Sequence, residues 1–161
     1  MPAPLDIKVR AVHPDDATAI LRVHEQSIRE LGPTGYAPEE VESWAAGLRA
    51  EGYVEEMASG ETLLVAEAES RIVGFGGLKS EEINTLYVAP EMARRGVGSA
   101  LLQSLESIAR DRGRRRLRLT ATLIGEPFYR RHGYRELDRR KHPTRGGILI
   151  DSVVMEKDLA A

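Results

Sequence analysis

The loop at residues 94–99, Arg-Arg-Gly-Val-Gly-Ser, has the residue types and the spacing of a phosphate-binding site. It leads directly into a helix-forming segment, and the free N–H groups and positive dipole end of a helix N-terminus attract anions. Gly96 and Gly98 let the main chain approach an anion closely. The guanidinium groups of Arg94 and Arg95 could add charge-assisted hydrogen bonds. The sequence therefore predicts a phosphate site, the alternative being a turn that only starts a helix.

Two widespread phosphate motifs do not fit this loop. A dinucleotide-binding loop needs a third glycine, where this chain has Leu101, and an acid about twenty residues further on within a repeating strand–helix pattern. A Walker loop needs Gly-Lys-Ser or Gly-Lys-Thr after a longer gap, and the chain lacks that sequence. The predicted site is therefore of another kind.

The elements on either side of the loop must hold it in place. Residues 82–88 are predicted to form a strand, and the breaker pair Ala89-Pro90 follows. From Val97 onward a helix is predicted, with Gly113 as its left-handed C-cap. Apolar residues recur along this helix at helical spacing, at Val97, Leu101, Leu105 and Ile108.

The run LYVAPEMARRGVGSALL, residues 86–102, resembles the acyl-CoA-binding motif of the GNAT N-acetyltransferase superfamily. The resemblance covers about residues 7–157, with one departure: Ala93 stands where the family pattern usually has Gln or Arg. It implies acetyl-CoA as co-substrate and a GNAT-like α/β fold, a central mixed sheet of about seven strands flanked by about four helices. The coenzyme-binding residues that it implies are Leu86, Tyr87, Val88, Arg94, Arg95, Gly96, Val97, Gly98 and Ser99.

Acetyl transfer to an amine requires a base for the ammonium, a donor to the oxyanion and an acid for the departing thiolate. Glu82 matches the family's carboxylate base, and in a regular strand its side chain shares a face with Leu86 and Val88. The resemblance implies that the central strand and the strand after the helix splay apart. The Leu86 N–H would then bind the oxyanion and the Val88 N–H the pantetheine arm. The alternatives are a solvated strand end for Glu82 and an unbroken ladder at Leu86.

The run EPFYRRHGY, residues 126–134, matches the family's second signature, in which a Tyr four residues before a Gly reaches the coenzyme sulfur. The resemblance therefore makes Tyr129 the general acid, and a phenol with a pKa of about 10 is protonated at neutral pH. Packing in the core is the alternative. One family contact is weakened, because Thr122 or Ile124 stands where many relatives carry an Asn.

The acceptor pocket is expected from the first two helices and the segment before the last strand. Tyr36 and Trp44 are the candidate substrate residues, although Trp44 could equally be ordinary helix packing. His24 could face the acceptor, and the four histidines show no metal-binding spacing. A small-molecule amine, a protein N-terminus and a lysine all remain open as acceptors.

Periodicity and breakers predict the remaining elements. Strands are expected at residues 7–12, 62–67, 71–78, 82–88, 116–121, 134–137 and 148–155. Helices are expected at residues 14–31, 38–48 and 126–132, in addition to the one from Val97, and Glu51-Gly52 is expected to close the second. This order predicts a mixed sheet with helices on both faces.

Composition limits the class of protein. The 161 residues predict a single domain, residues 1–161, and a net charge of −2 argues against a nucleic-acid partner. The absence of cysteine excludes a disulfide framework, a thiolate nucleophile and a thiolate metal site, and we expect no metal. The chain start lacks signal-peptide features and no apolar run spans a membrane, so a cytoplasmic location is expected.

Two functions are consistent with these residues. The favoured one is an acetyl-CoA-dependent N-acetyltransferase in which the amine attacks directly in a ternary complex, because no cysteine can carry an acyl group. The alternative is a non-catalytic acyl-CoA-binding regulatory module, in which Glu82 and Tyr129 serve only the structure. By analogy with the fold, a homodimer is possible.

Overall fold

The computed structural model describes residues 4–159. Residues 1–3 and 160–161 belong to the expected domain 1–161 but lie outside the described residues. Residues 1–3 are also part of the chain start in which no signal peptide is expected.

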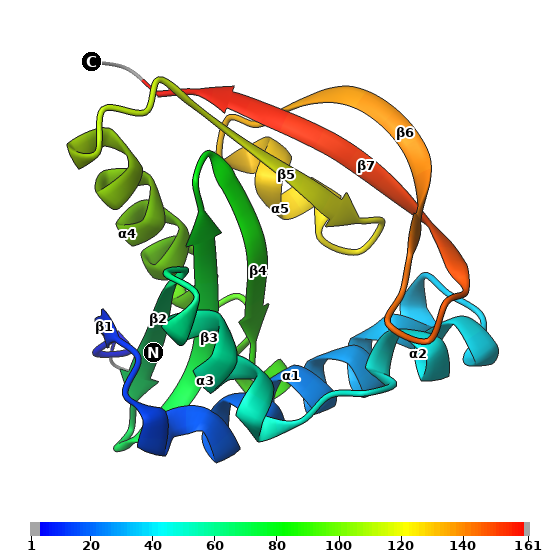
Figure 1. Ribbon diagram of the computed structural model, residues 1–161, viewed down its shortest axis with the longest axis horizontal. Coiled ribbons are helices and arrows are strands. Elements are labelled where there is room, and N and C mark those ends of the chain that lie inside the picture. Colours follow the sequence, from blue (N-terminus) through cyan, green and yellow to red (C-terminus); the bar gives the residue numbers. More distant parts are fainter. Residues whose placement is uncertain (1–3, 160–161) are drawn as a thin grey trace.

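Seven strands form one mixed sheet in the order β1-β2-β3-β4-β5-β7-β6 (Figure 1). Every neighbouring pair is antiparallel except β4 and β5, which are parallel. The strands are β1 Lys8–Ala11, β2 Thr62–Ala68, β3 Arg71–Lys79, β4 Glu82–Val88, β5 Arg116–Thr122, β6 Arg135–Pro143 and β7 Leu149–Asp158. The predicted fold class, a mixed sheet of seven strands with helices, is confirmed.

Helices cover both faces of the β2–β4 part of the sheet, as alternation along β3 shows. Gly74 and Gly76 face α4, because a Cβ atom at these positions would lie 2.9 Å from Val97 and 3.1 Å from Leu105. Phe75 points the other way and packs against His24 and Tyr53, with ring centroids 5.2 and 5.7 Å apart. The α-helices are α1 Ala17–Leu31, α2 Pro38–Ala45, α3 Ala50–Ala58, α4 Val97–Asp111 and α5 Glu126–Arg131. Glycine in β3 therefore lets α4 pack close to the strand that supports β4.

The predicted apolar stripe of α4 is confirmed at its first three residues. Val97, Leu101 and Leu105 are fully buried against the sheet, and Ile108 is partly buried. Gly113 adopts the left-handed conformation, with φ +77°, one residue beyond the C-cap. The N-terminus of α4 is thus held rigidly next to β4 by the packing of its own first turn.

β6 and β7 form a long ribbon, orange and red in Figure 1, whose turn docks on α2. The Gly146 N–H donates to the Ser43 carbonyl at 2.9 Å, and the Ile148 N–H donates to the Ser43 hydroxyl at 3.2 Å. A Cβ atom at Gly146 would lie 2.5 Å from the Ser43 hydroxyl oxygen, so only glycine fits there without a shift. The ribbon therefore links the C-terminal strands to the second helix.

The predicted end of the second helix is wrong. Glu51 and Gly52 do not close the second helix but lie in the first turn of α3, because α2 already stops at the extended Ala46 and the left-handed Gly47. Their helix is instead held by Tyr53, which is buried beside Phe75. The structure thus has five α-helices among its described residues, where about four were expected.

The sixth strand is longer than the predicted residues 134–137, because β6 continues to Pro143. Every β6 residue is exposed, so its sequence lacks the apolar alternation that marks a half-buried strand. Pairing with β7 keeps it extended.

Candidate active site

β4 and β5 are joined only at the start of β4. The paired residues are Glu82 with Arg118 and Ile83 with Leu119, and the Arg118 N–H also donates to the Glu81 carbonyl at 2.9 Å. Beyond Ile83 the strands separate around a cavity of about 250 Å³. Its walls include residues 83–88 of β4, residues 119–122 of β5, Gly98 of α4, and Phe128 and Tyr129 of α5. The parallel ladder is therefore broken, as the resemblance implies.

The register of β4 against β3 directs the Leu86 and Val88 main chains into this gap. The Ala89 N–H donates to the Val73 carbonyl at 2.8 Å, and hydrogen-bonded pairs alternate along an antiparallel ladder. The pair Phe75–Tyr87 therefore falls at a hydrogen-bonding position. Leu86 and Val88 fall at the intervening positions, whose N–H groups point away from β3. Two main-chain donors thus face the cavity, whereas the Tyr87 main chain faces β3.

The loop before α4 has a left-handed backbone at two residues. Gly96 has φ +90°, which costs glycine little, whereas Arg94 has φ +62°, a conformation that costs other residues of order 1 kcal/mol. Val97 is buried, so only its main chain can meet a ligand. The guanidinium of Arg95 lies 3.8 Å from the Glu69 carboxylate in the β2–β3 turn.

Gly98 stands between β4 and α5. A Cβ atom there would lie 3.1 Å from the Phe128 ring and 3.6 Å from the Val88 side chain. The missing side chain leaves the main chain of the first α4 turn open to the cavity. The N-terminus of α4 therefore combines free N–H groups, a positive dipole end and open space, which suits an anion.

Ser99, in the same turn, is bonded to a residue of the α5 end. Its hydroxyl lies 2.8 Å from Nε2 of His132, whose Nδ1 lies 2.8 Å from the Phe128 carbonyl oxygen. The two residues are 33 positions apart, so no sequence spacing pointed to this pair. Phe128 also escaped sequence reasoning, although its position in the EPFYRRHGY run was a usable signal.

Tyr129 lines the cavity wall opposite β4. Burial, and secondly the nearby Tyr87 hydroxyl, raise the pKa of the Tyr129 phenol above its usual value. The group therefore stays protonated at neutral pH and can donate a hydrogen bond into the cavity.

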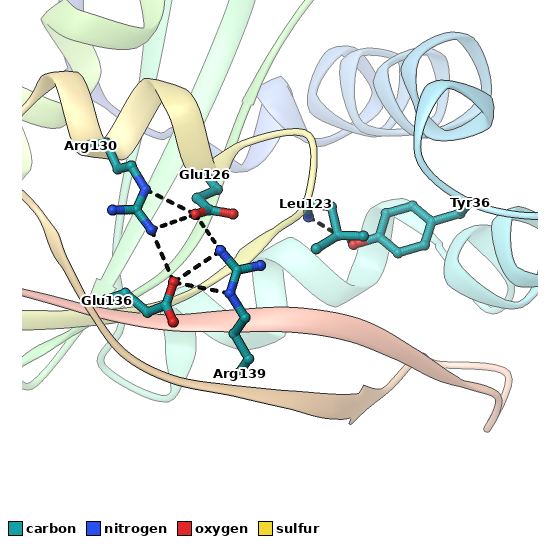
Figure 2. A network of polar contacts seen from close by, with 6 residues as sticks. All are labelled: Tyr36, Leu123, Glu126, Arg130, Glu136 and Arg139. Atoms are coloured by element: carbon teal, nitrogen blue, oxygen red, sulfur yellow. Dashed lines mark hydrogen bonds and ion pairs between the residues drawn. The ribbon is translucent and has the colours of Figure 1, made fainter.

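The helix that carries Tyr129 is fixed at both ends. At its start the Gly125 N–H donates to the Thr122 hydroxyl at 3.0 Å, which holds the turn after β5. Arg130 and Arg139 both bind the same Glu126 oxygen at 2.7 Å, and both contact Glu136 of β6 at 2.9 Å (Figure 2). These arginines are about half exposed, so the network orients α5 more than it stabilises the fold.

A β-bulge changes the direction of Glu82. The register with β3 shifts between the pairs Gly77–Thr85 and Leu78–Ile83, so one extra residue of β4 lies between them. Directly paired residues share a face, so the bulge puts Ile83 on the Leu86 face and Glu82 on the Tyr87 face. The expectation that Glu82 shares a face with Leu86 and Val88 is therefore wrong. Among the described residues, the cavity wall begins at Ile83 and Glu82 is exposed beside it.

Trp44 and Tyr87 line the other side of the cavity. The Trp44 indole N–H donates to the Tyr87 hydroxyl at 3.2 Å. Tyr36, the other candidate substrate residue, is only 8% exposed and stands behind Trp44, outside the cavity wall formed by the described residues. Its hydroxyl donates to the Asp151 carbonyl at 2.7 Å. The same hydroxyl accepts from the Leu123 N–H at 2.9 Å, as Figure 2 shows. Tyr36 thus ties the end of β5 to β7.

A family model described as an acetyltransferase (GNAT) domain matches residues 34–159. The chain belongs to the GNAT acetyltransferase family. The GNAT chain is 26% identical to the uncharacterised N-acetyltransferase YafP of Escherichia coli K12 over 88% of its own length and 89% of that protein.

Solved structures share this GNAT fold. A GCN5-related N-acetyltransferase from Rhodopseudomonas palustris, described as an aminotransferase of class II, superposes with a TM-score of 0.90, 29% identity and 99% coverage of both chains. The PaiA N-acetyltransferase of Thermoplasma acidophilum, solved in complex with coenzyme A, has a TM-score of 0.77 and 24% identity, and the match covers 95% of this chain and 99% of that one.

His24 of this GNAT chain lies behind Tyr87 and does not reach the cavity wall drawn by residues 4–159. It is 2% exposed, its Nδ1 lies 2.9 Å from the Tyr53 hydroxyl, and its ring centroid is 4.3 Å from that of Tyr87. Burial, and secondly the positive charge of Arg145, lower the pKa of His24 to about 3. The imidazole is therefore neutral and supports Tyr87 from behind.

Within residues 4–159, no three His, Asp or Glu side chains gather in a way that could hold a metal ion. Over the same residues, no helix combines the length and the apolar character needed to cross a bilayer.

Proposed function

We propose that this GNAT protein is an acetyl-CoA-dependent N-acetyltransferase whose residues 1–161 form one catalytic domain. The observation that carries the proposal is the broken β4–β5 ladder. It leaves the Leu86 and Val88 N–H groups facing a cavity that reaches the N-terminus of α4. Buried main-chain donors are costly without a partner, so such a gap suits a ligand that supplies acceptors. A protein of this fold has been solved with coenzyme A, which supports the same ligand here.

The coenzyme would bind along β4 and across the loop before α4. Its pyrophosphate would meet the main-chain N–H groups at Gly96, Val97, Gly98 and Ser99, with Arg94 as the additional cation. The pantetheine arm would accept from the Val88 N–H, much as a neighbouring strand does. The Tyr87 side chain would line the path, since its main chain is engaged with β3. Arg95 would contribute charge next to Glu69 rather than a direct contact.

The acetyl group would then lie between β4 and α5. The Leu86 N–H would donate to the acetyl oxygen and bind it more strongly as negative charge develops. Tyr129 would donate to the coenzyme sulfur. Because its pKa is raised well above the value of about 8.5 typical of a thiol, Tyr129 would act as a hydrogen-bond donor to the thiolate and keep its own proton, in place of the full proton transfer expected of a general acid. The thiolate would take its proton from water once the acetyl group has been transferred. The amine attacks directly, since no cysteine is present to carry the acyl group.

Glu82 is the proposed base. The β-bulge places it on the same face of β4 as Tyr87, which is the side of the sheet that carries Trp44 and the expected acceptor. Its position just outside the cavity wall favours proton transfer through water. The acceptor itself is a primary amine of a small molecule, peptide or protein.

The proposal is tested by measuring acetyl-CoA turnover as the release of free thiol, with a panel of amines, amino acids, polyamines and peptides as acceptors. Glu82→Gln is expected to lower amine-dependent kcat/KM by about tenfold, or about 1.4 kcal/mol of transition-state stabilisation. Glu81→Gln is the matched control. Glu81 is the neighbouring residue and has the same charge, but its carboxylate lies 3.9 and 3.8 Å from the guanidinium groups of Arg114 and Arg116. Equal loss in both variants would remove Glu82 as the base.

The binding-module alternative predicts a different result from the same samples. Acetyl-CoA would bind, no amine would accelerate thiol release, and Glu82→Gln and Tyr129→Phe would change only stability. Failure to bind the coenzyme at all would contradict both functions.

A further inference from the structure

The Ser99–His132 pair connects the loop before α4 to the end of α5. Ser99 is the third residue of α4, in the turn whose N–H groups face the proposed pyrophosphate site. The His132 ring is partly buried against Phe128, with ring centroids 4.4 Å apart. The pair therefore joins the coenzyme loop to the helix that carries Tyr129.

The distances determine which ring nitrogen of the neutral imidazole carries the proton. Nδ1 lies 2.8 Å from the Phe128 carbonyl oxygen, and a carbonyl can only accept, so Nδ1 must be the N–H. Nε2 is then an acceptor, and the group 2.8 Å away, the Ser99 hydroxyl, must donate to it. With a neutral His132, the Ser99 proton is turned toward the ring and away from any phosphate.

Protonation of His132 reverses this last hydrogen bond. Both ring nitrogens of an imidazolium are donors, so Nε2–H would donate to the Ser99 oxygen. The Ser99 hydroxyl proton is then free to turn to a second acceptor. A phosphate oxygen at the N-terminus of α4 would gain one hydrogen bond from Ser99 and one unit of positive charge nearby.

We propose that His132 is a positioning residue for the coenzyme, acting through Ser99, so that pyrophosphate binding takes up a proton on the imidazole. The inference rests on the proposed function, because it assumes the coenzyme pyrophosphate in front of α4. Proton uptake on binding requires that affinity fall as the pH rises through the range in which histidine loses its proton.

Other charged groups stand on the elements next to His132 and Ser99. They are Arg131 on α5, Arg130 in ion pairs with Glu126 and Glu136, the Lys157–Glu106 pair, and Arg94 and Arg95 before α4. The side chain of Lys157 comes within 3.4 Å of a Cβ built on Gly133, the residue after His132. Each of these groups is present in all the variants compared below, so a difference between the variants reports on the Ser99–His132 pair.

Binding of 3′-dephospho-coenzyme A, measured by calorimetry at about pH 5.5 and about pH 8, tests the inference. This probe keeps the pyrophosphate and lacks the 3′-phosphate, whose own proton would otherwise complicate the result. The unmodified protein is expected to bind about fivefold more tightly at the lower pH. Repeating the titration near neutral pH in buffers of different ionisation enthalpy should show net proton uptake.

His132→Gln keeps a polar group near Ser99 but cannot titrate, and it should reduce the pH effect to less than about twofold. Ser99→Ala removes the hydroxyl that would turn to the phosphate but keeps the imidazole and its charge, so it should reduce the pH effect without abolishing it. This second variant keeps the test available if His132→Gln folds poorly. His142→Gln, on the exposed strand β6, is the matched control and should keep the full pH effect.

The outcomes separate the two proposals. A pH effect and a proton uptake that persist unchanged in His132→Gln and Ser99→Ala overturn this inference and leave the coenzyme site intact. No binding by the unmodified protein at either pH overturns the proposed function and, with it, this inference.

Discussion

The two sides of the cavity are built from different parts of the chain. The side proposed for the coenzyme presents main-chain groups: the N–H groups of Leu86 and Val88 and the first turn of α4, which is open because Gly98 lacks a side chain. The side proposed for the acceptor presents side chains, chiefly Trp44 and Tyr87, supported by the buried His24 and Tyr53.

Under the proposed function, this difference would let the protein keep its coenzyme site while substitutions change its acceptor. Main-chain donors are directed by the strand register and the helix axis, so an ordinary substitution does not remove them. A side-chain wall changes with every substitution. We therefore expect coenzyme affinity to be sensitive only to changes that block space, and acceptor selectivity to respond to single residues.

Blocking the coenzyme side should have the largest effect. In Gly98→Val the new side chain would collide with Phe128, 3.1 Å from the Cβ position, and fill the space over the first α4 turn. Affinity for coenzyme A, measured by calorimetry, should fall by about a hundredfold, or about 2.7 kcal/mol. Gly52→Val is the control, because nothing lies within 4 Å of a Cβ there and its affinity should be unchanged. Tight binding by Gly98→Val would show that the coenzyme does not use this turn.

The support of the acceptor side should depend on pH. The pKa of His24 is about 3 in the fold, against about 6.5 for a free imidazole, so the unfolded chain binds more protons between these values. The stability that His24 contributes is present above about pH 6.5 and is lost progressively as the pH falls. The free energy of unfolding should decrease by about 2 kcal/mol from about pH 7 to about pH 5.

Denaturant titrations at the two pH values measure this decrease. His24→Gln removes the titrating group and should make the decrease smaller by about that amount, whereas the exposed His142→Gln should leave it unchanged. An unchanged decrease in His24→Gln would mean that other groups cause the loss.

Tyr129 and Tyr36 allow a catalytic role to be distinguished from a structural one. Tyr129→Phe removes a hydroxyl in the cavity and should lower kcat by about tenfold with little change in coenzyme affinity. Tyr36→Phe removes a hydroxyl bonded to the Asp151 and Leu123 main chains, and should lower the free energy of unfolding by about 1–2 kcal/mol. Its kcat should change by less than about twofold. The reverse pattern would make Tyr36 the functional residue of the two.

The smallest expected effect tests the acceptor side directly. Trp44→Leu opens space beside Tyr87 and removes the indole N–H that bonds its hydroxyl at 3.2 Å. The acceptor KM should rise by about fivefold, while the affinity for coenzyme A stays within about twofold. A larger loss of coenzyme affinity than of acceptor KM would show that the two sides are not independent.

The elements that local patterns specify were predictable. Glycines and arginines before an apolar stripe marked the loop and α4. Apolar runs bounded by turns and breakers marked β2 to β4, alternation marked β5, and the EPFYRRHGY run marked α5. Each of these signals lies within a short segment, where side-chain periodicity and backbone preferences act directly.

Tertiary structure decided the rest of the site. The separation of β4 from β5 and the bulge that redirects Glu82 depend on the register between strands, which local sequence does not specify. Tyr36 bonds Leu123, which is 87 positions further along the chain, and Asp151, which is 115 positions further. The Ser99–His132 hydrogen bond joins residues 33 positions apart. The sequence by itself thus determined the loop, the helices' apolar faces and the chemistry available. Which groups meet at the cavity was decided by long-range packing, because contacts between distant segments form only when the whole sheet closes around them.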